Sequence, residues 1–419
     1  MRVQPLAFLQ PGAAGEPAGT QPRSAAAAAP RAVDHRLRAI DILRGLVIVL
    51  MVLDHVRHYF HASGFVFDPL DPARSNALLY ATRWVTHFCA PTFVFLTGVS
   101  AWLQGANGKT TPTLSGFLLK RGLWLVVLDV TAVSFGWSFS LPYFLFLQVI
   151  WAIGWAMVAM AALVWLPRPV VLAVGIAIVA GHNLLDPLTP QQFGSLGWLW
   201  MFLHEGGMWS AGGAPVAFVG YPVLAWIGVM AIGYGSGPAF LSAKRDRILL
   251  LIGAAMIAAF LMLRAFNFYG DPRPWVEEAS WTATIMRFLD VTKYPPSLLF
   301  VCATLGPMLL IMPLLERWSG TPGRVLQVFG AVPLFAYLLH IYLIHLLSIA
   351  AHALSGRSTN GLFDFLRKAI LDPASLSALD LPISATFVAW GVTLVLLYPC
   401  CVWWRALKAR RRDWWLSYL

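Results

Sequence analysis

The first long apolar stretch of the chain carries a line of polar residues at helical spacing, Asp41, Arg44, His55 and His58. At about 100° per residue, His55 lies about 20° from Arg44 and about 40° from Asp41 around a helix, and roughly 16 Å from Arg44 along its axis. An imidazole that is neutral near pH 7 suits a general base, and a guanidinium suits an anion anchor. The four side chains therefore predict a reagent channel along one helix. Asp41 and Arg44 could equally form an i,i+3 pair that only anchors the helix start.

A group that orients the His55 imidazole is expected on another segment, because Asp54 points about 100° away around the helix although it is adjacent in sequence. His87 and Asp129 are candidates for this group, since each falls at a similar depth in its own apolar segment. For Asp129, a structural hydrogen bond between two segments is the slightly favoured alternative.

Further candidates lie in the second half of the chain. Arg264, Lys293 and Tyr294 border the expected outer side of the membrane, where they could meet the polar groups of a substrate. His340 and His345 are five residues apart, about 140° around a helix, so both cannot face one pocket. We expect His345 to serve the site, because of its depth, and His340 to pack.

Patterns typical of metal, nucleotide and disulfide sites are missing from the sequence. His55, His58 and His61 drift around the helix, and no H-E-x-x-H element is present, so no metal site is predicted. Neither a phosphate-binding loop, nor a dinucleotide fingerprint, nor a nucleophile elbow is found. The cysteines lie unpaired in apolar runs and are predicted to be packing residues: Cys89, Cys302, Cys400 and Cys401.

The composition is that of an integral membrane protein. Of 419 residues, 58% are hydrophobic and only 12% are charged, and the mean hydropathy is +0.68. A soluble domain has about 25% charged residues. The net charge of +11 therefore indicates a positively charged inner face rather than nucleic-acid binding.

Apolar runs long enough to cross a bilayer predict an all-α bundle of about ten transmembrane helices. They are residues 39–60, 81–104, 115–138, 142–166, 169–185, 214–235, 247–268, 296–315, 329–350 and 384–404. Most cations fall on the inner side if both termini are cytoplasmic, and the segment 196–203 suits an interfacial piece. We expect a disordered tail at 1–33, a membrane domain at 34–404, and a basic, aromatic cytoplasmic tail at 405–419.

The segment Asp41-Ile42-Leu43-Arg44-Gly45, followed by an apolar run that ends in His55, resembles the first-helix signature of the membrane acyltransferase superfamily. This superfamily includes surface-polysaccharide O-acetylases. The resemblance implies that His55 is the catalytic base and that Arg44 is essential near the acyl-donor site.

Other stretches, across residues 36–419, resemble a bacterial family grouped with the heparan-alpha-glucosaminide N-acetyltransferase catalytic domain. They include Gly181-His182-Asn183-Leu184-Leu185-Asp186, Tyr269-Gly270-Asp271-Pro272, Lys293-Tyr294-Pro295-Pro296-Ser297-Leu298 and His340-Ile341-Tyr342-Leu343-Ile344-His345.

These observations lead to a main hypothesis of an inner-membrane acyltransferase. It would take an acyl group, most simply acetyl, from cytoplasmic acyl-CoA as co-substrate, without a tightly bound cofactor. The acceptor would be a hydroxyl or amine of a glycan or lipid-linked molecule at the outer face, with His55 as base or transient acyl carrier. The alternatives are a transporter, whose Asp41, Arg44, Asp54 and Asp129 bind solute or protons, and a non-catalytic scaffold. The acceptor, the acyl chain and the oligomeric state stay open.

Overall fold

The structure is a computed structural model that describes residues 38–61, 67–318, 320–411, 413 and 416. The tail predicted at 1–33 lies outside the described residues, as does part of the tail predicted at 405–419. The described residues are about 74% helical and 4% strand, which confirms a helical protein and adds a small sheet that was not predicted.

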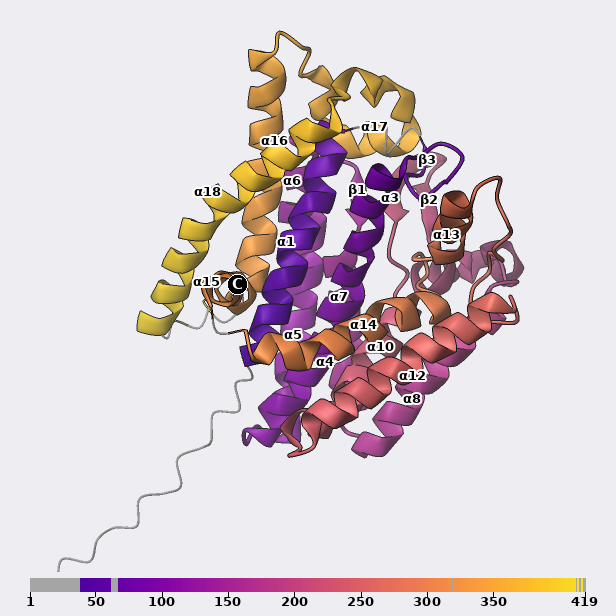
Figure 1. The fold of residues 1–419 in the computed structure, drawn as a ribbon, viewed down its shortest axis with the longest axis vertical. Coiled ribbons are helices and arrows are strands. Elements are labelled where there is room, and N and C mark those ends of the chain that lie inside the picture. The colour runs from indigo at the N-terminus through magenta and orange to yellow at the C-terminus, as the bar shows by residue number, and fades with distance from the viewer. Residues whose placement is uncertain (1–37, 62–66, 319, 412, 414–415, 417–419) are drawn as a thin grey trace, which may run out of the picture. The chain divides into compact units, whose positions relative to one another are not determined.

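The helices follow one another along the chain, some joined directly and others by longer loops or strands (Figure 1). Their bounds are α1 (Arg38–Phe60), α3 (Ala77–Trp84), α4 (Cys89–Ala106), α5 (Thr111–Leu128), α6 (Ser134–Ser138), α7 (Val149–Leu163), α8 (Arg168–Gly181), α9 (Gly197–Trp200), α10 (Leu224–Gly235), α11 (Gly237–Leu241), α12 (Arg245–Ala265), α13 (Trp281–Leu289), α14 (Leu298–Glu316), α15 (Thr321–Ala331), α16 (Pro333–Leu354), α17 (Phe365–Leu371) and α18 (Ile383–Arg410). Two π-helical turns, Asp129–Val133 and Met201–Glu205, extend α5 and α9.

Among the described residues, seven helices are long and apolar enough to cross a membrane. They are Ala77–Ala106, Arg168–Leu185, Leu224–Leu241, α12, α14, α16 and α18. The other three predicted spans correspond to α1, α5 and α7. Charged side chains lower the hydropathy of α1 and α5, and α7 has only 15 residues. Ten spans and cytoplasmic termini stay predictions.

Two predicted spans began too early, because the structure places strands there. β1 (Leu145–Leu147) pairs in parallel with β3 (Ala214–Val219), and β2 (Gly207–Ala211) pairs with β3 in antiparallel. The hairpin between β2 and β3 turns at Gly212 and Gly213, both with positive φ. A pair of glycines is a strong hairpin signal, and a short apolar run after it can be a strand as well as a helix. The segment predicted to be interfacial contains α9.

Helix α1 is held by direct backbone contact with α15. A Cβ atom on Gly330 would lie 1.7 Å from the carbonyl oxygen of Asp41, and one on Gly45 would lie 1.8 Å from that of Leu326. Only glycine allows two helix backbones to approach so closely, as is common between membrane helices. Similar glycine contacts join α4 to α10, α5 to α7 and α12 to α14.

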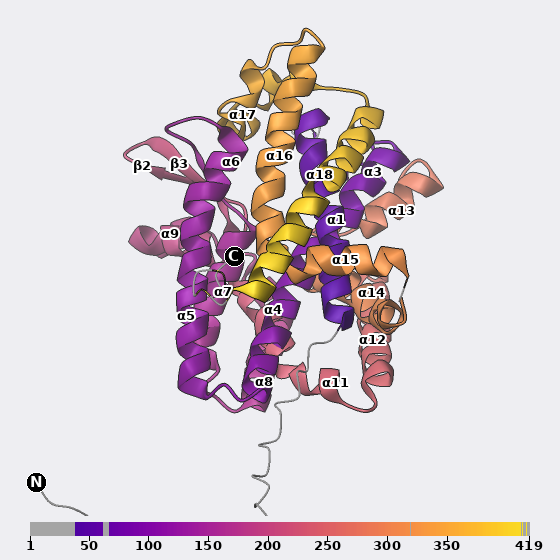
Figure 2. The same ribbon diagram turned by 90° about the vertical axis from the view of Figure 1, so that its left-hand side faces the viewer.

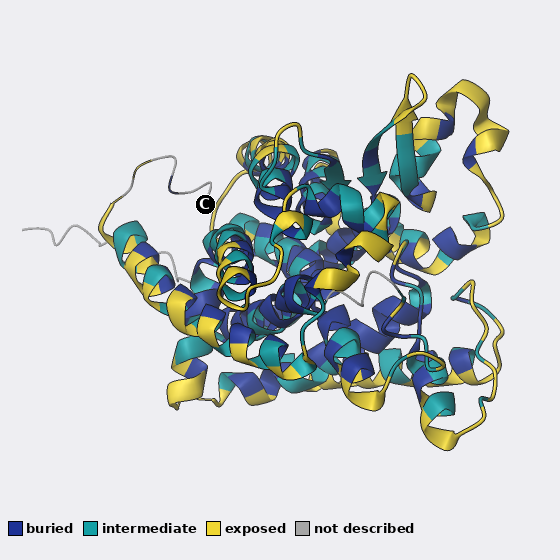
Figure 3. Ribbon diagram, turned by 90° about the horizontal axis from the view of Figure 1, so that it is seen from above, coloured by how far each residue is buried: buried dark blue, intermediate teal, exposed yellow. Residues whose placement is uncertain are grey.

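Helices α16 and α18 run alongside α1 (Figures 1 and 2). Buried residues follow the middle of the bundle and exposed residues its outside (Figure 3). Several exposed residues on the outer helices are large and apolar, such as Leu251 on α12 and Val395 on α18. Such a surface is suited to contact with lipid. The polar line on α1 is thus enclosed by protein.

Candidate active site

His55 forms a hydrogen bond with a second histidine from α16. The His55 Nδ1 and His340 Nε2 atoms are 2.7 Å apart, and the two ring planes are within 17° of parallel. His340 Nδ1 lies 3.0 Å from the carbonyl oxygen of Ala336, one turn earlier in α16. Although His345 was the residue expected at the site, the structure places His340, and not His345, in contact with His55.

This chain of contacts determines which nitrogens carry protons in the neutral rings. A carbonyl oxygen can only accept, so His340 Nδ1–H donates to Ala336 and His340 Nε2 becomes an acceptor. His55 Nδ1–H then donates to His340, which leaves a lone pair on His55 Nε2. A backbone carbonyl and a histidine thus do for His55 what a carboxylate does in a catalytic triad. The Nε2 atom has no hydrogen-bond partner among the described residues and is poised to accept a proton.

His55 lines a cavity of about 550 Å³, which we call the His55 cavity. Its walls come from α1, β3, α17 and the loop before α14. The lining residues are Asp54, His55, His58, Arg83, Trp137, Phe146, Gln148, Glu205, Gly206, Gly207, Phe218, Val219, Gly220, Tyr221, Tyr294, Leu366, Ala369 and Ile370. The sheet that sequence reasoning missed therefore forms one wall of the site.

Asp54 is part of a buried charge cluster beside this cavity. Arg57 Nη2 donates to Asp54 Oδ1 at 2.6 Å, and Arg83 Nη1 lies 3.4 Å from Asp54 Oδ2. Arg57 is almost fully buried, so removing its carboxylate partner would leave a charge in a medium of low polarity. This geometry gives Asp54 the role of holding two arginines, not of orienting His55.

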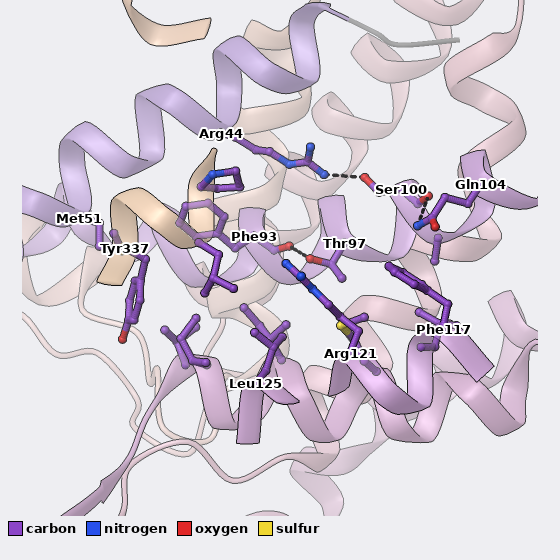
Figure 4. Close-up of a pocket in the computed structure, with 18 residues that line it drawn as sticks. Arg44, Met51, Phe93, Thr97, Ser100, Gln104, Phe117, Arg121, Leu125 and Tyr337 are labelled. Carbon is purple, nitrogen blue, oxygen red and sulfur yellow. Dashed lines mark hydrogen bonds between the residues drawn. The ribbon is translucent and has the colours of Figure 1, made fainter. Parts of the chain in front are cut away.

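A second cavity, of about 270 Å³, lies further toward the N-terminal end of α1 (Figure 4). We call it the Arg44 cavity. Arg44 enters it from α1 and Arg121 from α5. Arg44 donates to Ser100 Oγ at 2.5 Å and to the Leu96 carbonyl at 3.3 Å, and it lies 3.8 Å from Asp41. Most other lining residues are apolar: Met51, Phe93, Ala101, Phe117, Leu118, Leu125, Val149, Ile150, Ile153, Met157, Pro333 and Leu334.

The two cavities approach each other at the histidine pair. Tyr337 lines the Arg44 cavity, and its ring centroid is 5.4 Å from that of His340 and 6.3 Å from that of His55. Gln148 lines the His55 cavity, while the next residue, Val149, lines the Arg44 cavity. His55 therefore lines the larger cavity, and the Tyr337 ring of the smaller cavity lies next to it.

A comparison with known families identifies the chain. Residues 36–269 match the family described as heparan-alpha-glucosaminide N-acetyltransferase, catalytic. The chain belongs to this family. Among curated proteins, no match to the chain was found. The matched region holds Arg44, Asp54 and His55, whereas His340 lies beyond it.

In this member of the acetyltransferase family, several of the predicted site residues line neither of these two cavities, and three of them bond to the backbone instead. Asp129 is buried in a π-helical turn, and its Oδ2 accepts from the Gln148 backbone N–H at 3.3 Å. Arg264 donates to backbone carbonyls of the 271–290 region, including that of Asp290 at 2.7 Å. His345 has both ring nitrogens on backbone carbonyls, those of Gly136 and Leu362. All three have contacts that stabilise the fold.

Sequence reasoning about this family member missed several residues that line the cavities. Arg83, Arg121, Trp137 and Gln148 lie there, and each comes from an element whose orientation depends on packing. Tyr337 offered a signal, because it lies one turn before His340 on the same helix.

One group in this acetyltransferase-family chain has the residue types of a metal site. Ligand atoms of His182, Asp186 and His204 lie within 4.8 Å of one another. His204 Nε2 contacts Asp186 Oδ1 at 3.1 Å, and Asn183 donates to Asp186 Oδ2 at 2.9 Å. Burial acts to raise the pKa of Asp186, but the hydrogen bonds from His204 and Asn183 outweigh it and lower that pKa below its usual value. His182 Nε2 in turn donates to the Pro296 carbonyl, so the group ties α8 to the loop before α14.

Proposed function

We propose that the protein is an integral membrane acyltransferase that moves an acyl group, most simply acetyl, from acyl-CoA to a hydroxyl or amine of a glycan or lipid-linked acceptor. The observation that carries this proposal is the position of His55, with its Nε2 lone pair, between two cavities. The family match supports transfer of an acetyl group and does not favour the transporter alternative.

In this scheme the donor occupies the Arg44 cavity, because Arg44 and Arg121 suit the phosphates of CoA. The apolar lining suits the uncharged arm that carries the thioester. The acceptor occupies the His55 cavity, where polar groups are more numerous. With the N-terminal end of α1 on the cytoplasmic side of the inner membrane, the donor enters from the cytoplasm and the acceptor from the outer face.

The chemical step uses His55 as a general base. The acceptor hydroxyl or amine gives its proton to Nε2 as its oxygen or nitrogen attacks the thioester carbonyl carbon. The tetrahedral intermediate then collapses, the carbon–sulfur bond breaks, and the CoA sulfur takes the proton from the imidazolium. The products are the acylated acceptor and free CoA thiol.

The negative charge on the carbonyl oxygen needs hydrogen-bond donors during this step. Trp137 and Gln148 line the His55 cavity, and the Trp137 Nε1–H and Gln148 Nε2–H groups are buried without a partner among the described residues. The Trp137 ring centroid is 4.9 Å from that of His55. We assign these two donors to the oxyanion, since buried donors otherwise left without a partner are costly.

The test measures CoA thiol release by the purified full-length protein in detergent. Acetyl-CoA is the donor, and D-glucosamine and methyl glucoside are the amine and hydroxyl probes. His55→Ala is expected to lower turnover by about 10²- to 10⁴-fold, the usual contribution of a general base. His61→Gln is the matched control, because His61 contacts the Leu381 carbonyl and Asp380 and lines neither cavity. Undiminished turnover in His55→Ala would refute the role of His55.

A further inference from the structure

A third cavity, of about 350 Å³, lies beside the His55 cavity and shares two wall residues with it, Arg83 and Tyr294. We call it the Lys293 cavity. Its remaining lining residues are Asp68, Leu70, His87, Arg273, Val291, Thr292 and Lys293. Of all nine lining residues, three are cationic, Arg83, Arg273 and Lys293, and one is acidic, Asp68, so the walls carry a net positive charge.

Lys293 is a buried cation without a counter-ion. The residue is only 7% exposed. Among the described residues, its side chain forms neither an ion pair nor a hydrogen bond. The ammonium group lies over two aromatic rings, 5.2 Å from the Tyr294 centroid and 6.0 Å from that of Tyr221. Such contacts stabilise a cation by less than the burial of an isolated charge destabilises the fold. An anion in the cavity would supply the missing partner.

His87 is a second buried polar group without a partner in the same cavity. It is 2% exposed, and neither ring nitrogen has a hydrogen-bond partner among the described residues. The ring contacts Phe300 edge-on, with centroids 5.2 Å apart. A buried imidazole normally has a hydrogen-bond partner on at least one nitrogen. A group that enters the cavity would supply the partner that His87 lacks.

The other charged residues increase the positive potential only in part, because they have partners of their own. Arg273 lies 3.3 Å from Asp290, and Arg83 contacts Asp54. Desolvation acts to raise the pKa of Tyr294, but Lys293 and Arg83 outweigh it and lower that pKa below its usual value. The cavity is therefore positive where it adjoins the site of acyl transfer.

We propose that the Lys293 cavity binds a phosphate group of the acceptor, with Lys293 as the charge partner and a His87 ring N–H as a hydrogen-bond donor. This inference rests on the proposed function and narrows the acceptor to a phosphate-bearing molecule. The shared wall of Arg83 and Tyr294 lets one molecule place its phosphate here and its hydroxyl or amine near His55. Lysine is a common point-charge binder of phosphate.

The first experiment measures phosphate binding without any acyl transfer. Isothermal titration calorimetry on the purified full-length protein uses three probes: inorganic phosphate, glucose 1-phosphate, and nanodiscs that contain polyprenyl phosphate. Binding of at least one probe is expected, and Lys293→Met should weaken it at least tenfold. Lys293→Arg should retain most of it, and Lys244→Met, which changes an exposed lysine, is the matched control.

A purely structural role for Lys293 predicts a different result. Because the ammonium has no ion pair, Lys293→Met should leave the thermal unfolding temperature without ligand unchanged or raised. A lowered unfolding temperature, or binding of all three probes unaffected in Lys293→Met and His87→Phe, would overturn the inference.

The probes also separate the possible sources of phosphate. Preference for the nanodiscs assigns the site to a lipid-linked acceptor, and preference for glucose 1-phosphate assigns it to a free sugar phosphate. Acyl transfer to D-glucosamine without phosphate binding would refute this inference and keep the proposed function. Phosphate binding without thiol release would support this inference and refute the proposed function.

Discussion

The hydrogen bond from His55 to His340 leads to a quantitative prediction about His340. In His340→Leu the acceptor for His55 Nδ1–H is lost, so nothing favours the tautomer with the lone pair on Nε2. A neutral hydrogen bond contributes about 0.5–1.5 kcal/mol, and each 1.36 kcal/mol changes a rate tenfold. The rate of CoA thiol release should therefore fall about 2- to 13-fold. His55→Ala should cost about 10²- to 10⁴-fold.

A set of variants separates positioning from direct catalysis. His340→Gln offers an amide oxygen in place of Nε2 and should recover part of the lost rate. In the His55→Ala background, His340→Leu should cause no further loss, because residues that act as a unit are not additive. The assay is single-turnover thiol release, with correct folding checked by gel filtration and thermal unfolding. A loss in His340→Leu as large as that in His55→Ala, or multiplied losses in the double variant, would refute the reasoning and make His340 a base itself.

Four other results are expected. Trp137→Phe should lower kcat about 10²- to 10³-fold with little change in KM, as for loss of one oxyanion donor, and an effect confined to KM would contradict that role. Arg121→Gln should raise the KM for acetyl-CoA about tenfold or more, whereas an unchanged KM would place the donor elsewhere. Gly330→Ala should lower the unfolding temperature in detergent relative to Gly391→Ala, whose Cβ has no neighbour within 4 Å, because it forces α15 from α1. Dialysis against a chelator should leave thiol release unchanged. If the chelator instead lowered thiol release, and zinc restored it in the unmodified protein but not in His182→Gln, then His182, Asp186 and His204 would hold a metal.

The sequence could predict relations within one helix better than relations between helices. Arg44 and His55 share a face of α1 because helical periodicity alone sets their angle, and the structure puts each on a cavity. The choice between His340 and His345 depended on the rotation of α16 about its own axis. That rotation follows from packing against α1 and α18, which spacing along the chain does not contain.

Most of the other features that the sequence did not predict lie in loops and strands. Residues 214–219 form β3 because a glycine turn pairs them with β2, although an apolar run of that length also fits the start of a span. Lys293 was predicted to meet a substrate, but its cavity with His87 depends on how the loop before α14 lies against α3 and α4. Such tertiary placement overrides local pattern.

The close contacts at Gly45 and Gly330 bring the backbone of α1, the helix that carries both Arg44 and His55, directly against α15. Arg44 and His55 are therefore held at a set separation of roughly 16 Å along the helix axis. In the proposed scheme, the donor spans that length between its anionic end and its reactive carbonyl. Small activated acyl compounds without a long arm could fill one cavity only. The length of the donor would then determine which acyl compounds can be substrates.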